Sequence, residues 1–352
     1  MPIALLDAIS NFRENSHTTW HSAKSSKLVS TNPADASFRV YGGMANIRAD
    51  YPGPKLKKDA GVFTMGSCFA REIEGALLAM GGNVTSVDRR LITNRYFADG
   101  NGIYRDGFFH RFTPRAMLHE FKAAFGEFPG WDQSKSLILQ AGKGVHDLNY
   151  WPIIDTDNTL EATVFRRQTA HDLVRRAAKA DVIVLTLGLT ESWRQVSTGY
   201  DLNRFSPHLK KTPHDYTFDV LDYENVMACL EEIHALLHRH HETGNFQLVV
   251  TVSPVPLGST FTKQDIVVAN QTSKSTLRAA AGSFCQGKLG VNYFPSYEIV
   301  LHSRQAEAWR PDKLHVRHEL VRHIVRNFIT TYFEAGSFDT DSRAAARAAE
   351  DD

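Results

Sequence analysis

The feature that most constrains the fold is a continuous apolar run, D-V-I-V-L-T-L-G, at residues 181–188. A strand with one face in water alternates apolar and polar residues, and this run does not. Strands of this kind lie inside a parallel sheet that is covered on both faces. Similar short runs occur at 62–65, 246–254 and 291–295. We therefore expect a parallel sheet built from these segments.

The segments between these runs are typical of helices. Apolar residues at helical spacing are clearest in 69–80, and Gly81-Gly82 is a stop signal for that helix. Alternating strands and helices predict an α/β domain with helices on both faces of the sheet. The further helices that we expect are 115–125, 168–180, 222–243, 265–285 and the last one, 314–333.

Composition shifts divide the chain into three parts. Residues 1–58 are rich in Ser, Asn, Pro and Lys with weak periodicity, which predicts an extended lead-in that wraps the fold, or a lid over the rim of the sheet. The α/β domain spans 59–334, and 335–352 is expected to be a flexible tail. The pattern at 84–157 does not resolve into elements apart from the helix at 115–125.

Charge and cysteine content exclude several classes of function. The formal net charge is +1, so the chain has no global field for nucleic acid. Three scattered cysteines make neither a disulfide framework nor a zinc motif, and they fit a reducing compartment. The N-terminus lacks a basic signal-peptide region, and no apolar run reaches the roughly 18 residues of a membrane span. We expect a soluble, cytoplasmic protein without a membrane span, a metal or a cofactor.

The first strand is followed by a corner that can carry a nucleophile. Carboxyl ends of parallel strands meet at one edge of a sheet, where α/β active sites collect. Gly66, Ser67 and Cys68 stand at that edge and open the helix at 69–80. Glycine permits a sharp turn, and helix N-terminal N–H groups stabilise an oxyanion or a thiolate. Taken alone, the same three residues also fit a plain structural turn.

A base for this nucleophile stands late in the chain. In W-R-P-D-K-L-H-V, Asp312 and His315 are three residues apart at the expected start of the last helix. A carboxylate at that spacing can orient an imidazole that deprotonates a nucleophile. A lone D-x-x-H is more often a helix cap with an incidental histidine. The nucleophile corner and the pair together are far more specific than either alone.

Several ordered motifs resemble one family. The run G-S-C-F-A at 66–70 resembles the signature of the GSCFA domain family, which is related to the SGNH or GDSL-like hydrolases. The resemblance extends over roughly 62–315 and includes T-L-G-L-T-E-S-W, T-V-S-P-V-P-L, N-Q-T-S-K-S-T-L-R, Y-F-P-S-Y-E and D-K-L-H. It implies a three-layer α/β sandwich with a flavodoxin-like central parallel sheet.

The resemblance also implies site residues. On the relatives' G-D-S corner the nucleophile is the third residue, here Cys68, with Ser67 as the alternative one position earlier. The relatives' G-x-N-D loop corresponds to Gly188-Leu189-Thr190-Glu191, which lacks the oxyanion-hole asparagine. Thr190 can donate its hydroxyl in that place, and Glu191 is either a helix-start carboxylate or a ligand contact. The second oxyanion glycine is open among Gly100, Gly102 and Gly107.

For several other polar residues, a structural role competes with a functional one. Tyr297 and Glu298 follow a strand end. A place in the lining of the cleft and a purely structural place fit that position about equally well. The face with Asn270, Ser273 and Lys274 fits a solvated helix surface better than a substrate contact. The H-R-H-H run at 238–241 fits a charged helix end better than a metal site. The remaining cysteines, Cys229 and Cys285, are expected to be inert buried thiols.

The resemblance implies acyl-ester hydrolysis or O-acyl transfer, with glycan or polysaccharide acyl groups as substrate. His315, held by Asp312, would deprotonate Cys68 or Ser67, and the Cys68 N–H with the 188–190 loop would hold the oxyanion. The expected partner is a small-molecule or glycan acyl ester and not nucleic acid; the oligomeric state is open. The alternative is a non-catalytic glycan-binding or polysaccharide-assembly accessory protein on the same fold.

Overall fold

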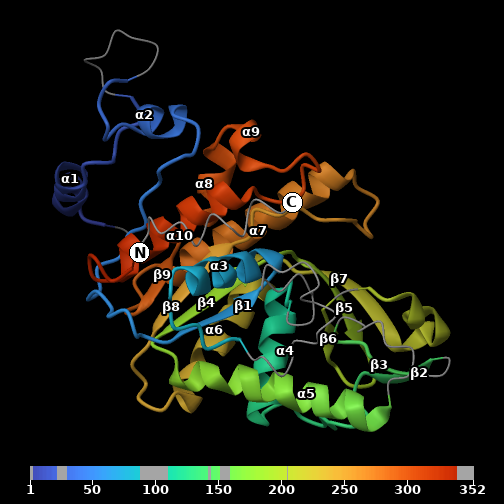
Figure 1. Cartoon of the computed structure of the whole chain (residues 1–352). Coiled ribbons are helices and arrows are strands. Elements are labelled where there is room, and N and C mark those ends of the chain that lie inside the picture. Colours follow the sequence, from blue (N-terminus) through green and yellow to red (C-terminus); the bar gives the residue numbers. More distant parts are fainter. Residues whose placement is uncertain are drawn as a thin grey trace.

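A four-stranded parallel sheet forms the centre of the computed structural model (Figure 1), which describes residues 3–21, 30–87, 110–141, 144–150, 159–203 and 205–338. All neighbouring strands in this sheet pair in parallel. The four strands coincide with the four apolar runs and so confirm the predicted sheet. In spatial order they are β1 (Val62–Gly66), β4 (Val182–Leu187), β8 (Gln247–Val252) and β9 (Val291–Tyr293).

One isolated bridge continues the parallel pairing beyond β1. Val62 of β1 forms a parallel bridge with Val84 on the side of β1 away from β4. The chain therefore starts inside the sheet, passes outward to Val84, and then crosses back to β4. This order reverses between β1 and β4, and ligands in such sheets bind at the carboxyl ends of the strands at that switch point.

Helices cover both faces of the sheet, which confirms the three layers. One apolar core joins the sheet to α3, α8 and α10, and the other joins it to α4, α5, α6 and α7. The first group is α3 (Cys68–Ala79), α8 (Ser296–His302) and α10 (His318–Tyr332). The second is α4 (Pro114–Phe125), α5 (Leu160–Arg175), α6 (Tyr223–His240) and α7 (Ile266–Cys285).

The predicted helices agree with these elements, with shifted ends. Helix α4 shows why the end signals work: the Thr113 hydroxyl accepts a hydrogen bond from Ala116 N, Pro114 fills the first position, and Gly126 ends the helix with φ of 76°. Helix α5 begins eight residues before the predicted 168 and continues into the 3-10 helix η3 (Arg176–Lys179). Helix α10 begins at His318 and not at 314.

Several short elements were not predicted. They form a hairpin, β2 (Ile138–Ala141) with β3 (Gly144–Asp147), and a three-stranded antiparallel sheet of β6 (Asp201–Leu202), β5 (Glu191–Gln195) and β7 (Tyr216–Val220). Most are too short for a periodic signal. The remaining short helices are η4 (Pro207–Lys211), η5 (Pro213–Asp215) and α9 (Gln305–Ala308).

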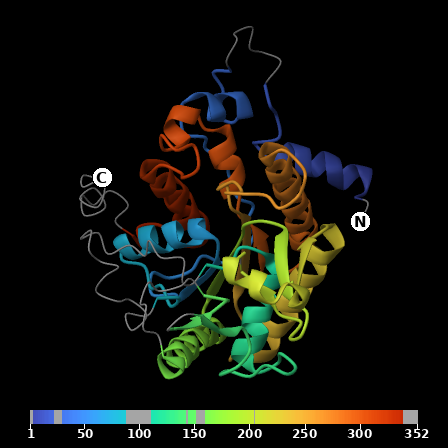
Figure 2. The ribbon, with the colours of Figure 1, turned by 90° about the vertical axis from the view of Figure 1, so that its right-hand side faces the viewer.

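The lead-in contains helices and is not only extended chain. Helices α1 (Leu5–Glu14) and α2 (Ala36–Tyr41) lie in it (Figure 2). Neither helix has a buried residue. Two contacts of the lead-in are to the connection between α8 and α9: Ala45 N donates to Ser303 Oγ, and Arg304 N donates to the Gly43 carbonyl. These two contacts lie just after the C-terminal end of α8 and not at the β1 corner.

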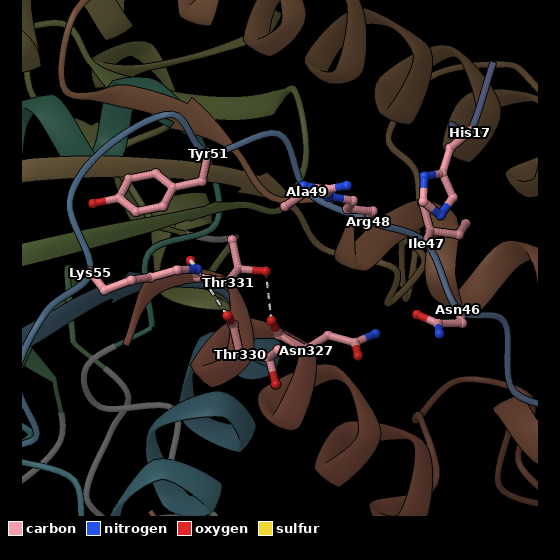
Figure 3. A pocket seen from close by; sticks show the side chains of 10 residues that line it. All are labelled: His17, Asn46, Ile47, Arg48, Ala49, Tyr51, Lys55, Asn327, Thr330 and Thr331. Atoms are coloured by element: carbon pink, nitrogen blue, oxygen red, sulfur yellow. Dashed lines mark hydrogen bonds between the residues drawn. The ribbon is translucent and has the colours of Figure 1, made fainter. Parts of the chain in front are cut away.

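The lead-in also contacts the C-terminal end of α10 (Figure 3). Lys55 Nζ donates to the Thr330 carbonyl at 3.0 Å and also to the Thr331 carbonyl. A cation at this position satisfies the last carbonyls of the helix and opposes its dipole. A pocket of about 390 Å³ lies beside these residues, and a second, of about 1130 Å³, lies along β9. Neither pocket is lined by a predicted catalytic residue.

Two further predictions concern the ends of the described segments. Phe338 is buried against Phe333, so the first residues after α10 pack on the core, while 339–352 lie outside the described residues. The glycines Gly100, Gly102 and Gly107 also lie outside them. Among the helices that the structure does describe, none combines the length and apolar character that crossing a membrane requires.

Candidate functional site

Gly66 brings the end of β1 unusually close to β4. Its φ is +155°, and a Cβ atom at this position would lie 2.6 Å from the Thr186 Cβ. No other residue fits without moving one of the two central strands. Ser67 N then donates to the Thr186 carbonyl at 3.3 Å, and the chain turns into α3. The corner therefore lies at the switch point of the sheet.

Ser67 and Cys68 differ in what surrounds them. Ser67 is the N-cap of α3, but its hydroxyl caps nothing; the side chain is 3% exposed and Oγ has no hydrogen-bond partner within the described part of the chain. Cys68 is the first helical residue, is partly exposed, and has the backbone N–H groups of Cys68 and Phe69 against its sulfur. Cys68 is thus the more accessible of the two candidate nucleophiles.

Opposing effects act on the Cys68 thiol. Burial raises its pKa, and the carboxylate of Glu72, one turn along α3, raises it further. The ammonium of Lys274 and the two N–H groups at the helix start lower it, but the pKa remains above its ordinary value. The resting group is therefore a thiol, and it needs a proton acceptor to become a nucleophile.

Lys274 is buried at this site, which makes the expected solvated helix face wrong. It lies on α7 with a side chain that is 1% exposed, and Nζ donates to the Gly188 carbonyl at 2.6 Å. Burial lowers the pKa of Lys274 to about 7, and the nearby Cys68 opposes this shift. The preceding Ser273 is also buried and accepts a hydrogen bond from Thr190 N at 3.0 Å.

The backbone N–H groups of the 188–190 loop donate hydrogen bonds to other segments of the protein. The N–H groups of Gly188 and Leu189 both donate to the Phe112 carbonyl, and Thr190 N donates to Ser273. These three N–H groups are therefore engaged within the protein. Gly188 is required here, because a Cβ would lie 2.7 Å from the Phe112 carbonyl oxygen and 3.3 Å from the Ser67 Cβ. The loop thus packs directly against the β1 corner.

Glu191 anchors a neighbouring loop. It opens strand β5, not a helix as one of our two interpretations had it, and is 9% exposed. Its carboxylate accepts hydrogen bonds from Thr260 Oγ1 at 2.5 Å and from Phe261 N at 2.9 Å. These contacts fix the loop between β8 and α7. The oxyanion or substrate contacts predicted for Thr190 and Glu191 stay predictions.

Asp312 and His315 form the predicted pair. His315 Nδ1 and Asp312 Oδ2 are 2.7 Å apart, and both side chains are about half exposed. The Asp312 carboxylate accepts hydrogen bonds from the backbone N–H groups of His315 and Leu314 and is also hydrogen-bonded to the His315 ring. These interactions hold the pKa of Asp312 well below its usual range. The pair lies in a loop before α10, and not inside that helix, because Asp312 caps the turn. The pairing leaves Nε2 of the imidazole for a substrate or nucleophile.

The 310–315 loop lies beside the first turn of α3. Glu72 of α3 is 3.8 Å from the guanidinium of Arg310 and 3.6 Å from His318, and Arg310 N donates to the His315 carbonyl. Within the described residues, no hydrogen bond joins His315 to Cys68 or Ser67. The structure thus brings the loop and the nucleophile helix together without joining the pair to the nucleophile.

The other predicted residues have structural partners. Tyr297 lies on α8 and is 8% exposed, while Glu298 pairs with Arg278 and accepts from Tyr293. Within the H-R-H-H run, Arg239 and His240 pair with Glu127. Burial raises the pKa of Cys229 to about 11 and that of Cys285 to about 12. Over the described part of the chain, no three metal-ligating side chains gather.

Two features of the site were missed from the sequence. Lys274 shares the spacing of the buried Leu277 and Ala281, so its place on the apolar stripe of α7 was a usable signal. Buried hydroxyls without partners also gather at strand ends. They belong to Ser67 after β1, Thr186 in β4 and Ser253 after β8, which are neighbouring strands. Unsatisfied buried polar groups are rare and mark places for water or a ligand.

Comparison with known proteins gives one match. The family model described as the GSCFA family matches residues 61–328, from the residue before β1 into α10. No curated protein and no solved structure matches the chain. The match therefore includes the corner, the buried lysine and the Asp312–His315 loop.

Proposed function

Because the chain belongs to the GSCFA family, we propose that it is an acyl-ester hydrolase or O-acyltransferase with the site plan of the SGNH or GDSL-like hydrolases. The proposed substrates are acyl groups on glycans or polysaccharides, an inference from family resemblance. We place the activity in the cytoplasm, where three unpaired cysteines suit a reducing environment.

One observation carries the proposal: Cys68 lies at the switch point of the sheet, at the start of α3, and the Asp312–His315 loop lies beside Glu72, one turn further along the same helix. A nucleophile at a helix start has N–H groups aimed at developing negative charge. A histidine whose Nδ1 is held by a carboxylate is the usual base for such a nucleophile.

The mechanism is acyl transfer in two steps. The Cys68 sulfur loses its proton to a base of the site and attacks the ester carbonyl, which becomes a tetrahedral oxyanion. The oxyanion collapses to a thioester and expels the alcohol, which takes up a proton. Water or a sugar hydroxyl, deprotonated by His315, then attacks the thioester and restores the thiol. Hydrolysis and transfer differ only in this acceptor.

The alternative is a glycan-binding protein that has kept the fold without turnover. The occupied N–H groups of Gly188, Leu189 and Thr190 favour it, because they leave fewer donors for an oxyanion. The Asp312–His315 bond opposes it, since a binding protein has no need of an oriented base.

Hydrolysis of para-nitrophenyl acetate and of acetylated oligosaccharides tests the proposal. We expect turnover by the wild type, its loss in Cys68→Ala and His315→Ala, and its retention in Ser67→Ala. Cys285→Ala is the matched control, because it removes a thiol from the far end of α7. A wild type that cleaves none of these esters but binds the oligosaccharides would support the alternative. Loss of turnover in Ser67→Ala alone would move the nucleophile to Ser67.

A further inference from the structure

We propose that Lys274 is the proton acceptor and counter-ion of Cys68. This inference rests on the proposed function in taking Cys68 as the nucleophile. It divides the proton transfers of the site: Lys274 serves the thiol, and His315 serves the water or sugar hydroxyl that acts as acceptor.

The burial of Lys274 is the first argument. Its side chain is 1% exposed, and within the described part of the chain no carboxylate lies within 4.0 Å of Nζ. A buried ammonium without an anionic partner is strongly unfavourable, so a lysine kept here must either be neutral or face a negative group. Its Nζ donates to the Gly188 carbonyl, which carries no formal charge.

The position of Lys274 is the second argument. Gly188, which accepts from Nζ, packs against Ser67, the residue directly before Cys68. The lysine reaches this point from α7 on one face of the sheet, while Cys68 begins α3 on the other. Both groups therefore lie at the carboxyl edge of β1 and β4. Their charges influence each other, as the opposing effects on both groups show.

Unpartnered hydroxyls supply a third argument. Ser67 Oγ, Thr186 Oγ1 and Ser253 Oγ are all buried, and none has a hydrogen-bond partner among the described residues. They stand at the ends of three adjacent strands around the same edge. Polar groups left without protein partners here fit a site that is completed by a substrate or by water.

The chemistry follows from the two resting states. The thiol keeps its proton and the amine is close to losing its own at neutral pH, so one proton can pass from Sγ to the Nζ lone pair. The resulting thiolate attacks the carbonyl, and the ammonium stands beside the oxyanion as it forms. When the thioester forms, the ammonium returns its proton to the departing alkoxide. No other reactant is required.

Other charges act on Cys68 but not directly on Lys274. Glu72 opposes thiolate formation, and Arg310 and His318 lie close to the carboxylate of Glu72. The N–H groups at the start of α3 favour the thiolate. Among the described residues, Cys68 is the titratable group whose ionised form acts on Lys274.

Alkylation of Cys68 by iodoacetamide, followed by peptide mass mapping from pH 5.5 to 10, tests the pairing. The variants are Lys274→Met, which removes the charge, Lys274→Arg, which keeps it, and Lys263→Met as an exposed-lysine control. We expect Lys274→Met to raise the midpoint of the Cys68 titration and to lower the rate at pH 7.5 at least tenfold. Lys274→Arg and Lys263→Met should not raise the midpoint.

A structural role for Lys274 gives a different result. If the lysine only ties down the 188–190 loop, Lys274→Met lowers the melting temperature and leaves the Cys68 midpoint unchanged, which overturns the proposal. Should Lys274→Met not fold, carbon-13 spectra of labelled lysines in wild type and Cys68→Ala give the answer. Loss of Cys68 should lower the Lys274 midpoint, and an unchanged midpoint overturns the pairing.

The alkylation readout separates this inference from the proposed function. A coupled Cys68–Lys274 pair in a protein that cleaves no ester leaves the pairing intact and removes the proposed activity. If ester cleavage depends on Cys68 but the titration midpoint of its thiol is the same in Lys274→Met as in the wild type, only the pairing is overturned.

Discussion

Replacement of Gly66 by alanine tests whether close approach of β1 and β4 builds the site. The added Cβ would lie 2.6 Å from the Thr186 Cβ, far inside a normal carbon–carbon contact of about 3.5–4.0 Å. Both strands are central and fully buried, so neither can move without disturbing the cores on both faces. Overpacking costs about 1–3 kcal/mol. The backbone at φ +155° adds a further cost of about 1–3 kcal/mol.

We therefore expect Gly66→Ala to lower the free energy of unfolding by about 2–6 kcal/mol. Urea denaturation measures this loss when the free energy of unfolding falls with urea concentration at the same slope in variant and wild type. Gly126→Ala is the matched control. Gly126 also has a positive φ, 76°, but nothing lies within 4 Å of the added Cβ. It should lose only the backbone part, roughly 1–2 kcal/mol. Equal losses in the two variants would show that the strand contact is not what requires glycine at position 66.

Two further predictions concern buried charges. Glu120→Gln should lower the free energy of unfolding by about 3–5 kcal/mol, because it leaves the fully buried guanidinium of Arg111 without its carboxylate at 2.8 Å; a loss below about 1 kcal/mol in urea denaturation would contradict this. Lys274 should make the protein more stable as the pH rises from about 7 towards the ordinary lysine range, since burial lowers its folded pKa to about 7 and the unfolded chain binds the extra proton. The difference between wild type and Lys274→Met measures this slope, and parallel curves would show that Lys274 is not depressed.

Local pattern was sufficient for the main elements of the domain. The apolar runs of β1, β4, β8 and β9 could be recognised because a strand buried on both faces carries its burial in consecutive residues. The short strands β5, β6 and β7 could not, because their pairing depends on partners that are distant in sequence. The helices of the lead-in were missed although the large apolar residues of α1, which are Leu5, Leu6, Ile9 and Phe12, have helical spacing; these side chains are exposed and not buried.

The predicted site divides in the same way. The Asp312–His315 pair could be anticipated, because three residues of spacing in one turn are enough to join a carboxylate and an imidazole. Its place in a loop before α10 depended on hydrogen bonds that the Asp312 carboxylate accepts from the backbone N–H groups of Leu314 and His315. Whether the N–H groups of the 188–190 loop were available also depended on a distant segment, because the Phe112 carbonyl accepts two of them.

The amino-acid sequence by itself determined the alternating strands and helices, the glycine corner before Cys68 and the membership of the GSCFA family. These features depend on residue types and short spacings, which act over one turn or one strand. Tertiary structure alone decided that the ammonium of Lys274 acts on Cys68. The physical reason is that solvation and charge depend on what packs around a group, and Lys274 meets the Cys68 corner only when α7 and α3 fold onto opposite faces of one sheet.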